Sequence, residues 1–91
     1  MEEKSSDREI QRVIWHSRRG MLELDLAFGP FAKEQYALLS AQDQAKYRKL
    51  LAQEDTDLFQ WVLQASKPND PELAFIMDKI LAYTKENKPV A

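Results

Sequence analysis

Two adjacent arginines, a glycine and two carboxylates follow one another closely near the start of the chain, within residues 18–25. The guanidinium groups of Arg18 and Arg19 are planar, permanently charged donors that suit carboxylates and phosphates. Gly20 has no side chain, so a ligand or the backbone of another molecule can approach the chain closely there. These residue types favour a docking surface over a catalytic centre.

The spacing of Arg19 and Glu23 has two explanations. In one unbroken helix the two side chains form an ion pair one turn apart, worth roughly a few tenths of a kcal/mol. Gly20 inside that helix costs about 1 kcal/mol relative to alanine, which is more than the ion pair returns. We therefore expect Gly20 to lie at a junction between two helices, where Arg19 and Glu23 are exposed side by side.

The chain offers few groups for catalysis or for holding a metal. His16 is the only histidine and there is no cysteine, so sites built on Cys–His pairs are excluded. Two glycines are too few for a glycine-rich phosphate loop. The acidic residues at 54, 55 and 57 lack the spacing of a calcium loop, and an acidic helix start explains them. We expect no enzyme, no metal site and no stably bound cofactor.

The composition is that of one small folded domain. With 91 residues, 44% of them hydrophobic, the chain can form one core but no deep substrate cleft. A net charge of −2 with interspersed signs argues against general nucleic-acid binding. The chain shows no apolar signal region and no run of membrane-spanning length, which predicts a cytoplasmic protein. Residues 1–6 and 87–91 are expected to be flexible.

The first expected helix begins at Ser6, which stands at capping-box spacing from Glu9. One face of this helix carries apolar or small residues, namely Ile10, Val13, Ile14 and Ser17. The opposite face carries Arg8, Arg12, Trp15 and Arg19. Trp15 leaves two interpretations open. It packs beneath a neighbouring helix of a bundle, or it is an exposed anchor for a partner, since Trp and Arg are enriched at interface hot spots.

Residues 21–28 alternate between apolar and polar like a strand. No other segment does so, and a lone strand leaves its backbone groups unpaired, so we expect a central, largely enclosed helix. Its two apolar sides are Met21, Leu24 and Phe28 on one and Leu22 and Leu26 on the other. Asp25 projects between these sides, where a buried carboxylate needs a basic group or an amide as partner. Glu23 faces solvent.

Further boundary signals complete an all-helical prediction. Gly29 and Pro30 are expected to end the central helix and to start a short one over residues 31–39. Ser40 begins the next helix, the acidic residues 54–57 begin another, and Asp70 begins the last. The predicted fold class is therefore all-α, a single compact bundle of about five short helices.

A series of short blocks resembles the signature of the small succinate dehydrogenase assembly factors of the SdhE type, which are bacterial flavinylation factors with mitochondrial relatives. The blocks are Trp15, Arg18-Arg19-Gly20-Met21, Glu23-Leu24-Asp25, Pro30-Phe31, Leu38-Leu39-Ser40, Leu50-Leu51, Glu54-Asp55, Asp57-Leu58-Phe59, Trp61 and Lys67-Pro68. The Arg-Gly-x-x-Glu element alone is a weak signal. The ordered series, which covers residues 8–81, is specific.

The resemblance implies a helical bundle that is not an enzyme and that is similar to proteins acting on FAD attachment in a partner. Members of that family bind the flavoprotein subunit of succinate dehydrogenase, and in bacteria that of fumarate reductase, and promote covalent attachment of FAD to a histidine of that subunit. The family's motif falls on Arg19, Gly20 and Glu23, which the family places against the flavoprotein. We expect Arg18 to share this contact with the flavoprotein, and Trp15 and Arg12 to extend it along the first helix. We expect the protein itself to be a monomer.

An antitoxin-like module is the alternative, because members of this family have also carried that label. Such a module would bind a small toxin or a cytoskeletal partner and would have no effect on covalent flavin. A small enzyme is a third possibility, but it needs a pocket with a poised acid–base pair, which this set of residues does not favour.

Overall fold

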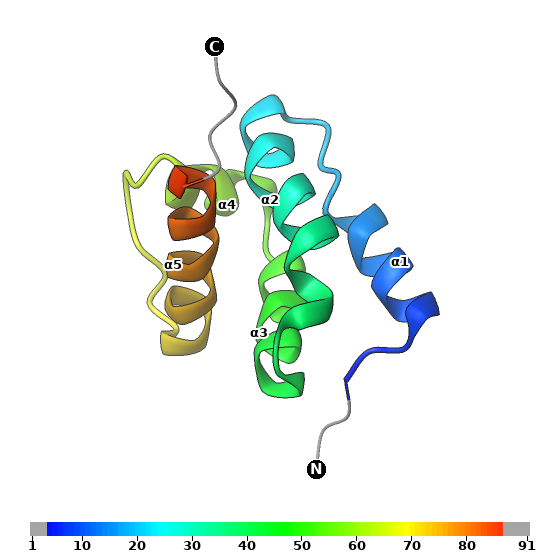
Figure 1. Ribbon diagram of the computed structural model, residues 1–91. Helices are drawn as coiled ribbons and strands as arrows, with labels where there is room; N and C mark the ends of the chain where they lie inside the picture. Colours follow the sequence, from blue (N-terminus) through cyan, green and yellow to red (C-terminus); the bar gives the residue numbers. More distant parts are fainter. Residues whose placement is uncertain (1–3, 87–91) are drawn as a thin grey trace.

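The structure is a computed structural model that describes residues 4–86 (Figure 1). This part of the chain forms five α-helices and one short 3-10 helix, joined by short connections. The elements are α1 (Asp7–His16), α2 (Leu22–Glu34), η1 (Tyr36–Leu38), α3 (Ala41–Leu51), α4 (Asp55–Val62) and α5 (Pro71–Glu86). The all-α prediction is confirmed. Of the ends expected to be flexible, residues 1–6 and 87–91, residues 1–3 and 87–91 lie outside the described residues. Within the rest, Ser5 is hydrogen-bonded to the side chains of Gln44 and Tyr36.

Short-range capping contacts fix where three of the helices begin. The Ser6 hydroxyl accepts a hydrogen bond from the backbone N–H of Glu9 at 3.3 Å, and the Ser40 hydroxyl accepts one from Asp43 at 3.1 Å. The Asp70 carboxylate accepts the N–H of Glu72 at 2.8 Å, directly before the α5 helix. Each cap satisfies a backbone donor that has no partner inside its helix. The predicted starts of these helices are confirmed.

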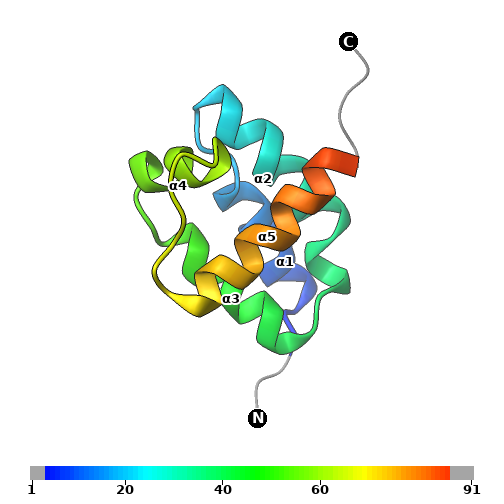
Figure 2. The ribbon, with the colours of Figure 1, turned by 90° about the vertical axis from the view of Figure 1, so that its left-hand side faces the viewer.

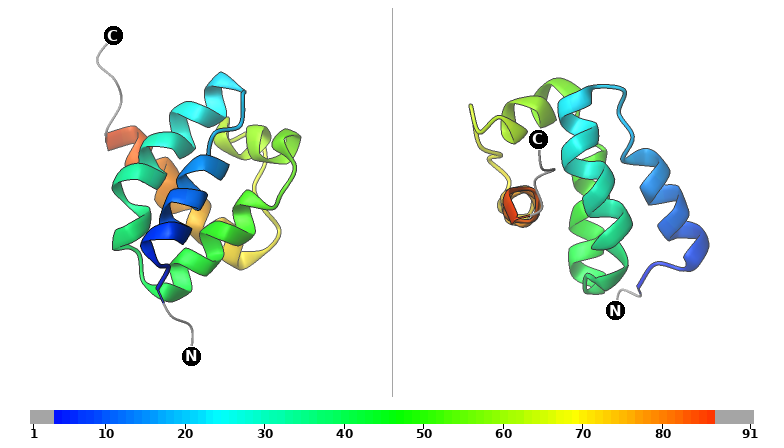
Figure 3. Two further views of the ribbon diagram at one scale, coloured as in Figure 1. Left: turned by 90° about the vertical axis from the view of Figure 1, so that its right-hand side faces the viewer. Right: turned by 45° about the horizontal axis from the view of Figure 1, so that its top comes forward.

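The helices form three layers. Helices α2 and α3 lie in the middle, α5 packs against both on one side, and α1 packs against α2 on the other (Figure 1, Figure 3). Figure 2 shows α5 crossing in front of this middle layer, with α1 behind it. Helix α4 packs against α2 and α5. The connection from α1 to α2 therefore lies at the edge of the middle layer, where α1 turns back onto it.

A cluster of aromatic rings around Tyr47 fills the middle of the core. Tyr47 is fully buried, and its ring centroid lies 5.5 Å from those of Phe31 and Tyr36 and 6.5 Å from that of Phe28. Burial raises the pKa of the Tyr47 phenol, so the group stays neutral. These rings join α2, η1 and α3 into one unit that holds the elements around it.

Helix α2 does not end at Gly29 and Pro30, so the predicted break and the predicted separate helix over residues 31–39 are wrong. The helix continues to Glu34 with Pro30 inside it. Two features allow the helix to continue. Gly29 has no Cβ to clash with the proline ring that follows it. The buried face of the helix also continues past the proline, from Phe28 to Phe31. Burial of that face outweighs the backbone hydrogen bond that proline cannot make.

Helix α2 is enclosed on one side only, which corrects the prediction of a largely enclosed helix. Leu24 and Phe28 are fully buried. On the other side Leu22 is 67% exposed and Leu26 is 52% exposed, although both are large apolar residues. The reason is the layered packing, because the helices against α2 cover the stripe through Leu24 and leave Leu22 and Leu26 in contact with water.

We expect Pro30→Ala to stabilise the protein. Alanine restores a donor for the carbonyl of Leu26 and removes the ring from a helix interior, and part of the gain is offset by a freer unfolded chain. The net increase in unfolding free energy should be about 1–2 kcal/mol, measured by urea titration. Pro71→Ala is the control, since Pro71 is the first residue of α5 and no intrahelical bond is missing there. Equal effects of the two changes would contradict this account of α2.

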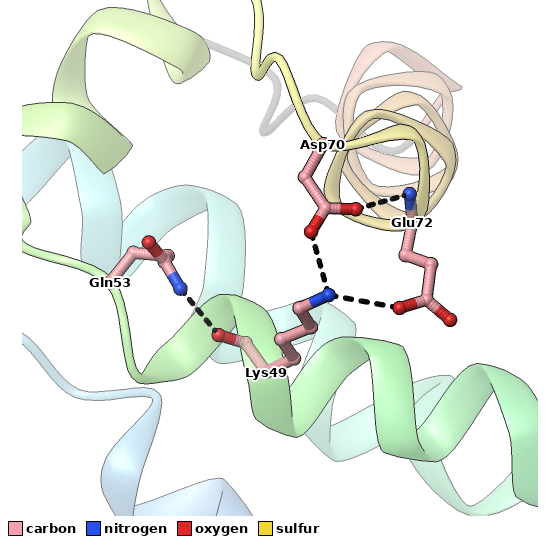
Figure 4. Close-up of polar contacts among 4 residues, drawn as sticks. All are labelled: Lys49, Gln53, Asp70 and Glu72. Carbon is pink, nitrogen blue, oxygen red and sulfur yellow. Dashed lines mark hydrogen bonds and ion pairs between the residues drawn. The ribbon is translucent and has the colours of Figure 1, made fainter.

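Lys49 ties α3 to the start of α5 (Figure 4). Its ammonium donates to the Asp70 carboxylate at 2.6 Å and to the Glu72 carboxylate at 2.9 Å. The carbonyl of Lys49 also accepts a hydrogen bond from the Gln53 side chain at 3.1 Å. The hydrogen bonds from Lys49, and then from the N–H of Glu72, hold the pKa of Asp70 below its usual value.

This tether predicts a weak dependence of stability on acid. The pKa of Asp70 is lower in the folded protein than in the unfolded chain. The stability that ionised Asp70 contributes is therefore fully present above its pKa in the unfolded chain, and it is lost as pH falls through its lower pKa in the folded protein. Asp70→Asn should reduce the drop in thermal midpoint on acidification, by a small amount because the pair is exposed to solvent. Asp78→Asn, at an exposed position of α5, is the control. An unchanged acid profile in Asp70→Asn would count against the tether.

Candidate functional site

The connection between α1 and α2, residues 17–21, is fixed in place at Ser17 and is open to solvent at Gly20. The Ser17 side chain is fully buried, and its hydroxyl donates to the carbonyl of Val13 and is hydrogen-bonded to the phenol of Tyr47, both at 2.8 Å. Gly20 is exposed and has a φ of +77°, and apart from Gly20 and its two chain neighbours no residue has a heavy atom within 4 Å of the place that a Cβ would occupy. Left-handed backbone of this kind favours glycine. The predicted helix junction at Gly20 is confirmed.

Arg19 reaches from this connection to the junction of α3 and α4. One terminal nitrogen of its guanidinium donates to the carbonyl of Leu51, the last residue of α3. The other lies 3.5 Å from the carboxylate of Asp55, the first residue of α4. Its backbone N–H donates to the Asp25 carboxylate at 2.6 Å. The side chain is only 18% exposed, so Arg19 is largely occupied within the fold.

The expectation that Arg19 and Glu23 stand exposed side by side is wrong. Helix α1 ends at His16, so Arg19 belongs to no helix that also contains Glu23, and the one-turn spacing no longer brings the two side chains together. The carbonyl end of α3 and a carboxylate at the start of α4 attract the cation instead. Glu23 is exposed, as predicted. Asp25 takes an amide as its partner, as predicted, and is half-buried.

Trp15 is 68% exposed, which excludes the interpretation that it packs beneath another helix. The guanidinium carbon of Arg18 lies 5.8 Å from the centroid of the Trp15 ring, close enough for a cation–π contact. Arg18 itself is exposed. Tryptophan and arginine are the residue types most enriched at interface hot spots, and here the two lie together on the surface.

An open groove of about 340 Å³ lies between α1 and α2, next to this connection. It is lined by Ile14, Arg18, Asp25, Gly29, Pro30, Lys33 and Glu34. Arg12 lies apart from it, at a second groove between α1 and α3 that it lines together with His16 and Arg48. The structure thus brings Trp15 and Arg18 together at the α1–α2 side and places Arg12 on the α3 side of the same helix.

Sequence reasoning missed the partners of Arg19. Asp55 was predicted only as part of an acidic first turn of a helix, which it also is. Its pairing with Arg19 joins two distant parts of the chain, and no local pattern signals it. The exposure of Leu22 and Leu26 was missed for a similar reason, because it depends on which faces the other helices cover.

Within residues 4–86, no three or more side chains of His, Asp or Glu gather as a metal-binding group. His16, the only histidine in the sequence, is exposed. In the same part of the chain, none of the helices combines the length and the apolar character needed to cross a membrane.

Fold and site together define a small all-helical domain whose candidate surface surrounds one connection between two helices. The chain belongs to the family described as the flavinator of succinate dehydrogenase, whose model matches residues 11–84. The chain is 48% identical to the FAD assembly factor SdhE of Pseudomonas aeruginosa over an alignment of 77 residues, which covers 85% of this chain and 92% of that protein. It is 39% identical to the protein of the same name from Pectobacterium atrosepticum over 80 residues, which cover 88% of this chain and 91% of that protein. The resemblance predicted from the sequence is confirmed.

Proposed function

We propose that this protein is an assembly factor that binds the flavoprotein subunit of succinate dehydrogenase and promotes the covalent attachment of FAD to it. The description of the family and the names of the relatives support this role. The observation on this chain that carries the proposal is Gly20, which is exposed, left-handed and open to close approach. Such a position lets the backbone of a large partner come within contact distance of the connection.

A helper of this kind need not perform chemistry. The flavin ring and a histidine of the client can form the bond themselves once they are held in the right geometry. A factor that binds the productive conformation of the client better than the alternatives raises the population of that conformation. We accordingly propose that the protein is not an enzyme and that it holds no FAD stably of its own.

We assign the contact surface to residues on α1, on the connection and on the first turn of α2. Trp15 and Arg18 provide an aromatic ring and an exposed cation for carboxylates and carbonyls of the client. Gly20 allows close approach, and the exposed Glu23 orients a basic group of the client. Arg12 extends the contact along α1. Arg19 belongs to the same motif, although its guanidinium lies against α3 and α4.

We further propose that the whole chain acts as one domain, as a monomer, in the cytoplasm. The flavoprotein subunit of fumarate reductase is proposed as a second client. The antitoxin-like alternative is not favoured, because the family and the relatives that the chain matches are named for flavin attachment and FAD assembly.

In-gel flavin fluorescence of the flavoprotein subunit tests the proposed function. The subunit is produced in cells that lack the factor, with and without this protein supplied. We expect a fluorescent band at the position of the subunit that is strong with the protein and faint without it, because covalent flavin survives denaturation. Equal fluorescence in both samples, with the protein shown to be present, would overturn the proposal. The antitoxin-like alternative predicts that equality.

A further inference from the structure

We propose that Asp55 is a positioning residue for client binding, and that it acts through Arg19 by fixing the connection that carries Gly20. This inference rests on the proposed function. In this proposal the Arg19 side chain contacts other helices of its own fold, whereas Gly20 faces the client. It also adds to the functional unit a carboxylate of α4 that lies far from the motif in the sequence.

The contacts of Arg19 join the connection to three helices at one residue. Its backbone N–H is bonded to Asp25 in the first turns of α2. Its guanidinium is bonded to the carbonyl of Leu51 at the end of α3 and paired with Asp55 at the start of α4. The next residue is Gly20, and apart from atoms of its two chain neighbours no heavy atom lies within 4 Å of the place that its Cβ would occupy. Gly20 is therefore held through its neighbours in the chain, of which Met21 packs against the core and Arg19 makes the polar contacts.

The electrostatics of this contact favour Asp55 as the counter-ion. A cation at the carbonyl end of α3 and an anion at the amide end of α4 each complement the dipole of the helix. At 18% exposure the Arg19 side chain is partly shielded from water, which strengthens its pairing with a carboxylate that is 42% exposed. Arg19 meets the carbonyl and the carboxylate with two different nitrogens of its planar guanidinium, a fixed fork that a lysine ammonium, with all its donors on one nitrogen, does not reproduce.

Fixing this connection matters because glycine is the residue with the most freedom to move. A glycine at a φ of +77° has other conformations available at little cost. A client that docks on a mobile connection must order it, and the ordering subtracts from the affinity. The Asp55–Arg19 pair removes that loss in advance, by holding the residue before Gly20 in one place.

The test compares Asp55→Asn with Asp57→Asn, which removes the same charge from an exposed position in the same first turn of α4. The affinity for the purified flavoprotein subunit is measured by titration calorimetry. We expect Asp55→Asn to weaken binding by about threefold to fivefold and Asp57→Asn to leave it unchanged. Asp55→Glu, which keeps the charge, should restore most of the affinity. Equal affinities of Asp55→Asn and the wild type would overturn the proposal.

A double-mutant cycle separates a positioning role from a direct contact. Arg19→Met keeps an unbranched side chain of similar thickness but has no charge to pair with Asp55. If Asp55 acts through Arg19, Asp55→Asn should have little further effect on affinity in the Arg19→Met protein. Additive losses would mean that Asp55 reaches the client by itself, and would overturn the proposal.

A measurement on the free protein keeps this inference separate from the proposed function. Backbone ¹⁵N relaxation of Gly20 should show increased fast motion in Asp55→Asn and not in Asp57→Asn, while the thermal midpoints report that both are folded. Unchanged relaxation at Gly20 would overturn the positioning role even if the client binds. Gly20 could become more mobile in Asp55→Asn as expected while the wild type binds no flavoprotein subunit. In that case the proposed function fails, and the link from Asp55 through Arg19 to Gly20 stands.

Discussion

Replacing Gly20 by asparagine is expected to reduce covalent FAD attachment to the background level while the protein stays folded. Asparagine tolerates left-handed backbone better than other residues with a side chain, and the space around a Cβ at this position is empty. The free protein should therefore accept the change with a loss of less than about 1 kcal/mol. If the client approaches at Gly20 as proposed, the added side chain projects into the space that the client needs, and the complex should be lost.

In-gel flavin fluorescence and the thermal midpoint are the two measurements for this variant. Ala37→Asn is the control, because it places the same asparagine side chain at an exposed position in η1, after the opposite end of α2. Full fluorescence with Gly20→Asn would show that the client does not come close to this residue. Gly20→Val is a poorer test, since the φ of +77° strains a β-branched residue and should lower stability by about 1–2 kcal/mol or more.

Replacing Trp15 by alanine should weaken binding of the flavoprotein subunit by about thirtyfold, with little change in the stability of the free protein. The ring is 68% exposed, so its removal leaves no cavity in the core. A central aromatic anchor at an interface typically contributes about 2 kcal/mol or more to binding, which corresponds to this loss. The cation of Arg18 on the ring would also lose its support.

Trp61→Ala is the matched comparison for Trp15→Ala. Trp61 lies on α4, is half-buried and packs against the core. Its removal should lower the unfolding free energy by about 1–3 kcal/mol, because a buried aromatic surface is lost. Chemical denaturation and calorimetric titration of both variants should thus give opposite patterns. Wild-type affinity in Trp15→Ala would remove this residue from the contact surface.

The parts of the fold that follow from local contacts could be predicted from the sequence. The starts at Ser6, Ser40 and Asp70 depend on side chains that bond to amides two or three residues away, so the signal and the contact lie in one short stretch. The junction at Gly20 was accessible in the same way, because a glycine is costly within a helix and favourable at a turn.

The parts that failed depend on packing between elements. Pro30 reads as a helix stop, and it is tolerated only because the buried stripe continues past it onto Phe31. The direction of Arg19 is set by Leu51 and Asp55, which become its neighbours only after α3 and α4 are in place. The blocks Leu50-Leu51 and Glu54-Asp55, which contributed to the resemblance, contain these two partners. What the sequence displayed as separate blocks is one contact in three dimensions.

The uncovered leucines of α2 have a consequence for how the factor behaves when it has no client. Leu22 and Leu26 expose apolar surface to water one helical turn apart. Contact with another macromolecule would bury this surface. We therefore expect an excess of the free protein over its client to favour nonspecific association through these two leucines. Supplying the client in equal amount should suppress that association, because the complex would occupy the same side of the protein.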